Sequence, residues 1–197
     1  LVGSEMCIRD RNIITNIDEL EKICKSADFS TEYYQEKSKE IDACYDEIIR
    51  EMPKNMNEKE AVQYFLNWIK DNVEYDYSVY ESSIEPYYDK LYENEVYADV
   101  SNKGCILDKR GICGGISIIL SELCNRVGIT AYPVFGTIKS DGTLIPHGWV
   151  AMRVDDSTYY IDPTYVCQTG EMDNLKMKNE MERIGDRQYQ LEDSFEY

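Results

Sequence analysis

This chain of 197 residues is short of histidine and cysteine, which limits the metal chemistry it can support. It holds one histidine, His147, and seven cysteines, no two of which form a C-x-x-C pair. Structural zinc sites draw four ligands from Cys and His at characteristic spacings, so we expect no metal and no cofactor. Disulfide scaffolds contain more than about 8–10% cysteine, a level that this chain does not reach.

Positive charge and long apolar runs are also scarce. The chain has 21 Lys and Arg against 38 Asp and Glu, a formal net charge of −17. Nucleic acids and anionic membranes attract clustered Lys and Arg, so we expect neither as a partner. The longest apolar stretch, around Ile116–Leu120, is far shorter than the ~20 residues of a transmembrane helix. The composition indicates a soluble, acidic globular protein, with the cytoplasm as the default compartment and export left open.

The chain divides by pattern into three parts. Leu1–Arg11 shows no helical or strand period and no signal-peptide arrangement, so we interpret it as a cloning scar or a truncated edge. Residues 12–56 are expected to form a helical extension. Residues 57–197 are expected to form the main domain.

Apolar residues at helical spacing predict helices in the first half of the chain. The first predicted helix covers Ile17–Cys24, and the second covers Ile41–Ile49 and ends before Pro53. Asn57 and Glu60 have the spacing of a capping box, which predicts the start of a third helix. The apolar face of this third helix is expected to consist of Ala61, Tyr64, Phe65, Trp68 and Ile69.

The second half of the chain changes from a helical to a strand period. Tyr77–Val100 is a long, acidic, tyrosine-rich segment that we expect at the surface, with a short helix at Tyr87–Tyr92. A longer helix is predicted from Cys113 to Val127, with Gly128 as its C′ residue. Three strands are then predicted, and turns at Ser140–Gly142 and Asp155–Asp156 separate them. They cover Ile129–Ile138, His147–Val154 and Thr158–Ile161, the last closed by Pro163.

The tail of the chain carries weaker signals. A helix is expected over Leu175–Ile184 and a last strand around Arg187–Leu191. Helices followed by an antiparallel meander are typical of the α+β class, which is the fold class that we predict.

Cys113 lies where a reactive thiol could form. Amide groups and the helix dipole at a helix start favour the thiolate, and Gly111, Gly114 and Gly115 allow close approach of the backbone. Most cysteines, however, are small buried hydrophobic residues, so position alone does not decide the matter.

The spacing of His147 and Asp162 indicates that they can meet. If Asp155 and Asp156 form a two-residue hairpin turn, the residue numbers of each cross-strand pair add up to 311, so position 147 lies opposite position 164. Asp162 is then the diagonal neighbour of His147 on the same face of the sheet. Such diagonal pairs lie ~7–8 Å apart, within reach of an imidazole and a carboxylate. With Cys113, these residues supply a nucleophile, a base and a group that orients the base.

These residues resemble the transglutaminase-like superfamily of papain-like cysteine enzymes. The resemblance is carried by four segments: Arg110–Gly115 at the start of a helix, Cys124–Ala131 at its end, His147–Val150 and Tyr160–Thr164. Two upstream segments, Phe65–Asp76 and Ser101–Ile112, also resemble the family. It implies a helix that carries the cysteine and packs on an antiparallel sheet.

The resemblance also assigns roles. It implies Cys113 as nucleophile, His147 as base and Asp162 as the orienting carboxylate, with Trp149 and Gly114 packing around the site. Gly114 and Gly115 replace the more usual small and aromatic residues after the cysteine. For the oxyanion, the backbone N–H of Cys113 is a candidate donor, and the loop at Asn102 and Gly104 offers a second.

Two functions remain open at this point. The first is a cysteine enzyme that acts on peptide or side-chain amide bonds of a protein or peptide through an acyl-thioester, as a peptidase, an amidase or a transamidase. The second is a binding or scaffolding module that keeps the fold without turnover. Other functions lack their motifs, since no G-x-S-x-G elbow, P-loop, G-x-G-x-x-G fingerprint or EF-hand calcium loop is present.

Overall fold

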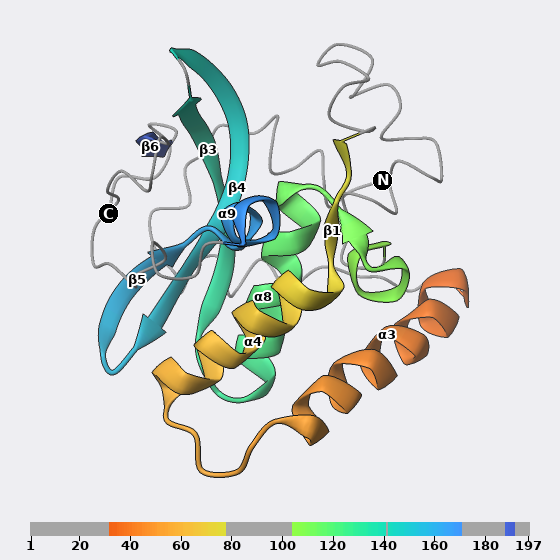
Figure 1. The fold of residues 1–197 in the computed structure, drawn as a ribbon. Coiled ribbons are helices and arrows are strands. Elements are labelled where there is room, and N and C mark those ends of the chain that lie inside the picture. The colour runs from red at the N-terminus through yellow and green to blue at the C-terminus, as the bar shows by residue number, and fades with distance from the viewer. Residues whose placement is uncertain (1–31, 78–103, 141, 171–187, 192–197) are drawn as a thin grey trace.

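The computed structural model describes residues 32–77, 104–140, 142–170 and 188–191 (Figure 1). The helices predicted at Ile17–Cys24, Tyr87–Tyr92 and Leu175–Ile184 lie outside these residues. Within them, helices cover one face of a four-stranded antiparallel sheet, which confirms the predicted α+β class.

The first two described helices form where the apolar period predicts them. Helix α3 (Glu32–Glu51) buries Ile41, Tyr45 and Ile48 and ends two residues before Pro53. Helix α4 (Glu58–Asn72) begins with the predicted capping box. The Glu60 N–H donates to Asn57 Oδ1 at 3.0 Å, and the Asn57 N–H donates to Glu60 Oε2 at 2.9 Å.

The buried face of α4 differs from the predicted one. Val62 and Leu66 are fully buried, whereas Tyr64 and Trp68 are only half-buried. The reason is that α4 packs against both α8 and α9, so its buried stripe is wider than a single apolar face. The Tyr64 hydroxyl lies at the rim and donates to the Ile48 carbonyl of α3.

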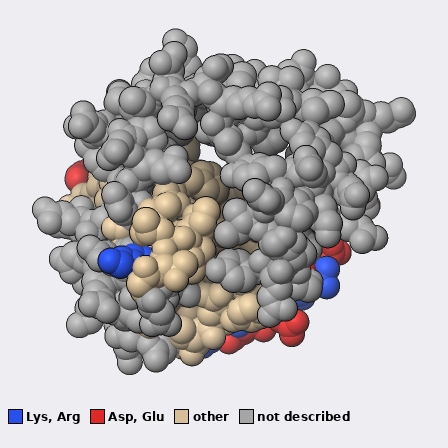
Figure 2. Space-filling view, turned by 90° about the horizontal axis from the view of Figure 1, so that it is seen from above, with Lys and Arg blue, Asp and Glu red and all other residues tan. Residues whose placement is uncertain are grey.

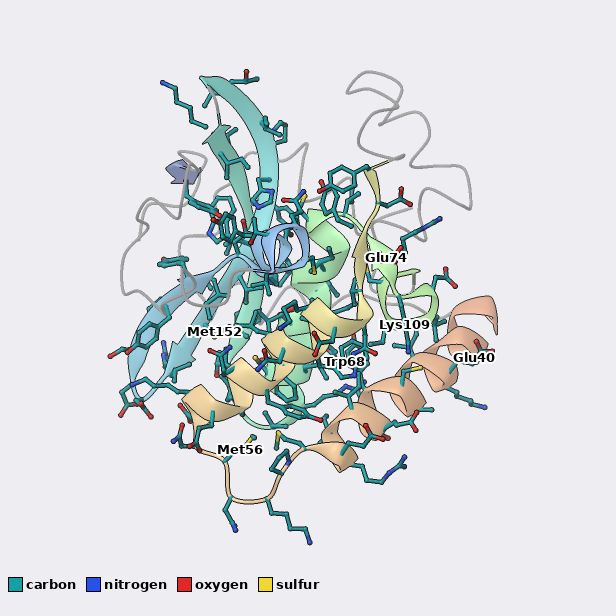
Figure 3. All side chains as sticks on the ribbon, viewed as in Figure 1. Glu40, Met56, Trp68, Glu74, Lys109 and Met152 are labelled. Carbon is teal, nitrogen blue, oxygen red and sulfur yellow. The ribbon has the colours of Figure 1, made fainter. Side chains whose placement is uncertain are left out.

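A short parallel pair of strands joins the end of α4 to the segment before the next helix. Strand β1 (Glu74–Tyr75) pairs with β2 (Arg110–Gly111), and a π-helical turn, η1 (Gly104–Asp108), leads into β2. Figure 3 shows Lys109 between this pair and α3. Sequence patterns did not predict this pairing, which links positions 36 residues apart.

Helix α8 (Cys113–Arg126) runs between the sheet and α4 (Figure 1). It begins at the predicted cysteine and ends one residue before the predicted boundary. Gly128 follows with a φ of 89°, the left-handed conformation that glycine adopts without strain. Ile116, Ile119, Leu120 and Leu123 are fully buried.

The sheet has the strand order β5-β4-β3-β6, and its neighbouring strands are antiparallel. Its strands are β3 (Ala131–Ser140), β4 (Thr143–Val154), β5 (Ser157–Ile161) and β6 (Gln188–Leu191). Strand β4 begins four residues before the predicted start, because its pairing with β3 continues to the turn. Strand β6 lies where a last strand was predicted and pairs with β3.

The predicted register between β4 and β5 is confirmed. Asp155 and Asp156 form the two-residue turn, both with positive φ, and Val154 pairs with Ser157. Strand β5 ends at Ile161, before Pro163, as predicted. The helix that follows was not predicted: α9 (Pro163–Thr169) begins at this proline, with Asp162 as its N-cap. Proline suits the first helical turn, where its missing N–H is no loss.

The two faces of the sheet support different packing. Val150, Met152 and Ile161 belong to the main core with α8 and α4, while Trp149, Ala151 and Tyr160 form a smaller cluster on the opposite face. Among the described residues, no helix is long and apolar enough to cross a membrane.

Two leucines allow a test of this core. Leu120→Ala on α8 should lower the free energy of unfolding by about 2–5 kcal/mol, because it leaves a cavity in a fully buried site. Leu144→Ala on β4, where the side chain is 60% exposed, should change it by less than about 0.5 kcal/mol. Urea unfolding of both variants measures the difference, and equal losses would contradict the described core.

Candidate active site

Cys113 lies at the first turn of α8 with its side chain half-buried. The residue before it, Ile112, has an extended backbone and provides no side-chain cap for the helix. The first amide groups of α8 are therefore not occupied by a capping side chain, and the positive end of the helix dipole lies at the cysteine.

Gly148 brings strand β4 against this helix start. A Cβ at position 148 would lie 3.6 Å from the Gly114 Cα and 2.9 Å from Cε1 of the Phe135 ring. The backbone N–H of Gly148 lies near the Cys113 sulfur and contributes to lowering the pKa of that thiol. Gly114 is one of the residues predicted to pack around the site. Gly148 was not predicted, since its only signal in the sequence is its position next to the single histidine.

His147 and Asp162 meet as the register predicted. The imidazole Nε2 lies 2.9 Å from Asp162 Oδ2, and both side chains are buried. The second imidazole nitrogen, Nδ1, remains for the Cys113 thiol, which lies close enough for the two groups to shift each other's pKa. The structure thus brings all three residues of the predicted triad together.

Asp162 is held through both of its oxygens. Its Oδ1 accepts from the backbone N–H groups of Thr164 (3.0 Å) and Tyr165 (3.2 Å) at the start of α9. Its Oδ2 accepts from His147 and from the hydroxyl of Tyr189, which lies 2.5 Å away. Donors of this kind stabilise an ionised carboxylate in a buried site.

Tyr189 and Trp149 pack around the imidazole. The Trp149 ring stacks on His147 at a centroid distance of 6.1 Å, and the Tyr189 ring meets Trp149 edge-on at 5.4 Å. The packing role predicted for Trp149 agrees with this arrangement. Tyr189 was missed, because the sequence predicted its strand but carried no signal for which strand β6 would pair with.

The electrostatics of the site favour a charged pair. Burial alone would raise the pKa of the Cys113 thiol, but the hydrogen bond and charge of His147, with the Gly148 N–H, lower it below its ordinary value. Burial opposes the charge on His147, but Asp162 and then Cys113 raise the pKa of His147 to about 10. Both shifts favour thiolate and imidazolium over the neutral pair.

The pKa values of three other cysteines shift in the opposite direction. Burial raises the pKa of Cys124 to about 12, and burial with the negative charge of Asp162 raises the pKa of Cys167 to about 12. Burial and nearby Glu47 raise the pKa of Cys44 on α3. Cys113 is therefore the only one of these four whose environment favours the thiolate.

The remaining predicted site residues lie at or beyond the limits of the described chain. Asn102 is outside the described residues, and Gly104 is the first residue of η1. Their role as oxyanion donors, and that of the Cys113 N–H, stays a prediction. Among the described residues, no group of three or more His, Cys, Asp and Glu could hold a metal ion.

Comparison with known proteins places the chain in a family. The sequence pattern of the transglutaminase-like domain matches residues 43–183, more than half of the chain. This chain belongs to the transglutaminase-like domain family. The match confirms the superfamily that the residues around Cys113, His147 and Asp162 resemble. No curated protein sequence matches the chain.

One solved structure supports the transglutaminase-like fold. A structure described as a TGase is 17% identical with a TM-score of 0.51, and the match covers 83% of this chain and 39% of that one. A candidate cysteine protease from Cytophaga hutchinsonii is 21% identical with a TM-score of 0.40, covering 69% of this chain and 40% of that one. The chain thus spans about two fifths of each structure, and the likeness to the TGase concerns the fold.

The shift of the Cys113 pKa gives a direct prediction. Near pH 6 Cys113 should react with iodoacetamide faster than Cys44, because its thiolate persists at lower pH while the raised pKa of Cys44 keeps that thiol protonated. Peptide mapping by mass spectrometry after timed labelling measures both rates in one sample. His147→Ala should abolish the advantage, since it removes the hydrogen bond and charge that do most to offset the effect of burial on the Cys113 pKa.

The pH dependence provides the control. Labelling of Cys44 should rise steadily with pH above neutrality as an ordinary thiol titrates, whereas labelling of Cys113 should already be near its plateau. Equal rates at pH 6, or a Cys113 rate that follows the Cys44 titration, would contradict the ion pair.

Proposed function

We propose that this protein is a cysteine-nucleophile enzyme that acts on peptide or side-chain amide bonds through an acyl-thioester. The observation that supports it is the continuous set of contacts from the Cys113 sulfur through His147 to the buried Asp162 carboxylate. Such chemistry needs a nucleophile next to a base, and a carboxylate that orients the base.

The proposed reaction has two halves. The Cys113 thiolate attacks the amide carbonyl, and the His147 imidazolium gives its proton to the departing nitrogen, which leaves an acyl-thioester and a neutral imidazole. Water or an amine then attacks the thioester, losing a proton to His147, and the thiolate is released. With water the protein is a peptidase or amidase, and with an amine it is a transamidase.

An apolar side chain lies beside the start of α8, where the acyl group of a substrate would meet Cys113. Figure 2 looks down on the molecule from the side where β1 and the β3–β4 hairpin end. Among the described residues visible there, uncharged side chains occupy the middle, and most Asp and Glu lie at the margin. Phe135, 45% exposed, packs over Gly148 beside the start of α8 and offers an apolar contact for a peptide segment.

Substitution of each triad member tests the proposal. Cys113→Ala and His147→Ala should abolish acyl-thioester formation, because the chain has no second histidine to replace the base. Asp162→Asn should slow turnover by up to about 10⁴-fold, as when a carboxylate–histidine pair is forced into the wrong tautomer. Release of ammonia or peptide products from a panel of glutamine-containing peptides, with and without an added amine, measures the activity.

Matched variants separate chemistry from folding. Cys44→Ala removes a half-buried thiol on α3 and should leave turnover unchanged. Asp162→Asn keeps an oxygen that can accept from the α9 amides, so circular dichroism should report a folded protein. Each double variant should be hardly worse than its worse single variant, because the three groups act as a unit. Full activity in Cys113→Ala would refute the proposal, and a folded protein that never acylates would favour the binding module.

A further inference from the structure

Tyr189 reaches the triad from the far edge of the sheet. Its strand, β6, pairs with β3, and Tyr189 lies opposite Ile138. His147 on β4 lies opposite Gly136 of the same strand β3. Because paired residues of antiparallel strands share a face and alternate residues return to it, Tyr189 and His147 lie on one face of the sheet.

Gly136 is the β3 residue between these two strands at the level of His147. It pairs with His147 on one side and with Leu191 on the other. Since glycine has no side chain, no β3 side chain at this position lies between β6 and the imidazole of His147. A tyrosine that enters diagonally from β6 can therefore cross β3 and bring its hydroxyl to Asp162.

The contact itself is specific. The Tyr189 hydroxyl lies 2.5 Å from Asp162 Oδ2, the same oxygen that receives His147 Nε2. The Tyr189 ring is 6.2 Å from the imidazole and packs edge-on against Trp149, so ring packing fixes the direction of the hydroxyl. A short O–H···O⁻ bond of this kind is among the stronger hydrogen bonds in proteins.

We propose that Tyr189 is a positioning residue that holds the Asp162 carboxylate in place and tunes its strength as the acceptor for His147. This inference rests on the proposed function for its effect on turnover, but its effect on His147 can be measured without activity. The hydroxyl fixes Oδ2 while the α9 amides fix Oδ1, so the carboxylate cannot rotate away from the imidazole. By sharing the charge on Oδ2, the hydroxyl also moderates the pull of Asp162 on the imidazolium proton.

The titratable groups around His147 and Asp162 come from several elements. Cys113 lies at the start of α8, Asp162 precedes α9 and Tyr189 comes from β6, while Cys167 on α9 is near enough to sense the Asp162 charge. Of these, Tyr189 is the neutral hydroxyl donor to the carboxylate. Removing its hydroxyl should therefore strengthen the bond from His147 to Asp162 and raise the pKa of His147.

Tyr189→Phe provides the test, because it keeps the ring against Trp149 and removes only the hydroxyl. The single histidine of the chain makes selective ¹⁵N-histidine labelling report on His147 alone. We expect the His147 titration to move to higher pH by about half a pH unit, a small shift for loss of one hydrogen bond to the partner carboxylate. We expect kcat to fall about tenfold, the loss of one positioning contact, with KM nearly unchanged.

Tyr64→Phe is the matched control. It also removes a partly buried hydroxyl, one that donates to the Ile48 carbonyl away from the site. It should leave the His147 titration and turnover as in the unsubstituted protein. A His147 titration in Tyr189→Phe that overlays that of Tyr64→Phe would overturn the inference, whatever the activity.

A second variant covers the case in which Tyr189→Phe does not fold. Site-specific Tyr189→3-fluorotyrosine retains the ring and hydroxyl but makes the hydroxyl a stronger donor. The His147 titration should then move to lower pH, and an unchanged titration would again overturn the inference. If the His147 titrations move as expected but no form of the protein turns over any amide, the positioning role stands and the proposed function fails.

Discussion

The buried Asp162 carboxylate is the group on which the arrangement of this site depends. Its side chain has no exposed surface, so its charge must be met by protein groups. Among the described residues, the donors to it include four groups from three different places: the start of α9, the imidazole on β4 and the hydroxyl on β6. A single ionised group thus ties the end of β5 to the strand on each side of β3. Loss of any of these elements would leave a buried charge partly unpaired, a costly state.

The sheet uses its two faces for two different tasks. One face packs α8 into the main core, which sets where Cys113 lies, and the other carries the cluster of Trp149 and Tyr160 beneath the imidazole. Gly148 lies between the two faces next to His147: a Cβ there would be in ordinary contact with Gly114 of α8 at 3.6 Å but too close to the Phe135 ring at 2.9 Å. The glycine therefore leaves room for the Phe135 ring, and β4 lies in backbone contact distance of the start of α8, which carries the nucleophile.

Local signals in the sequence predicted much of this arrangement. The Asn57 cap, the start of α8 at Cys113 and the turn at Asp155 and Asp156 each depend on residues within a few positions, and the turn alone set the register that joins His147 to Asp162. Contacts between distant positions were not predictable in the same way. Tyr189 is 27 residues from Asp162, and no pattern within β6 indicates that it pairs with β3. Helix α9 was missed because an Asp-Pro pair after a strand fits a strand end and a helix N-terminus equally well.

The balance of charge explains why so many neutral donors surround one carboxylate. With the thiolate present, the imidazolium lies between two negative groups, and both stabilise it. In the proposed cycle the thioester carries no charge, and His147 has given its proton to the leaving nitrogen. At that stage the buried Asp162 carboxylate lies beside a neutral imidazole, and the dipoles that stabilise it include the α9 amides, the imidazole N–H and the Tyr189 hydroxyl. The α9 amides and the Tyr189 hydroxyl keep the same charge throughout this proposed cycle, whereas His147 alternates between imidazolium and imidazole. Their hydrogen bonds hold Asp162 as the acceptor of the Nε2 proton, so that the neutral imidazole has the tautomer that leaves Nδ1 free to accept the next proton.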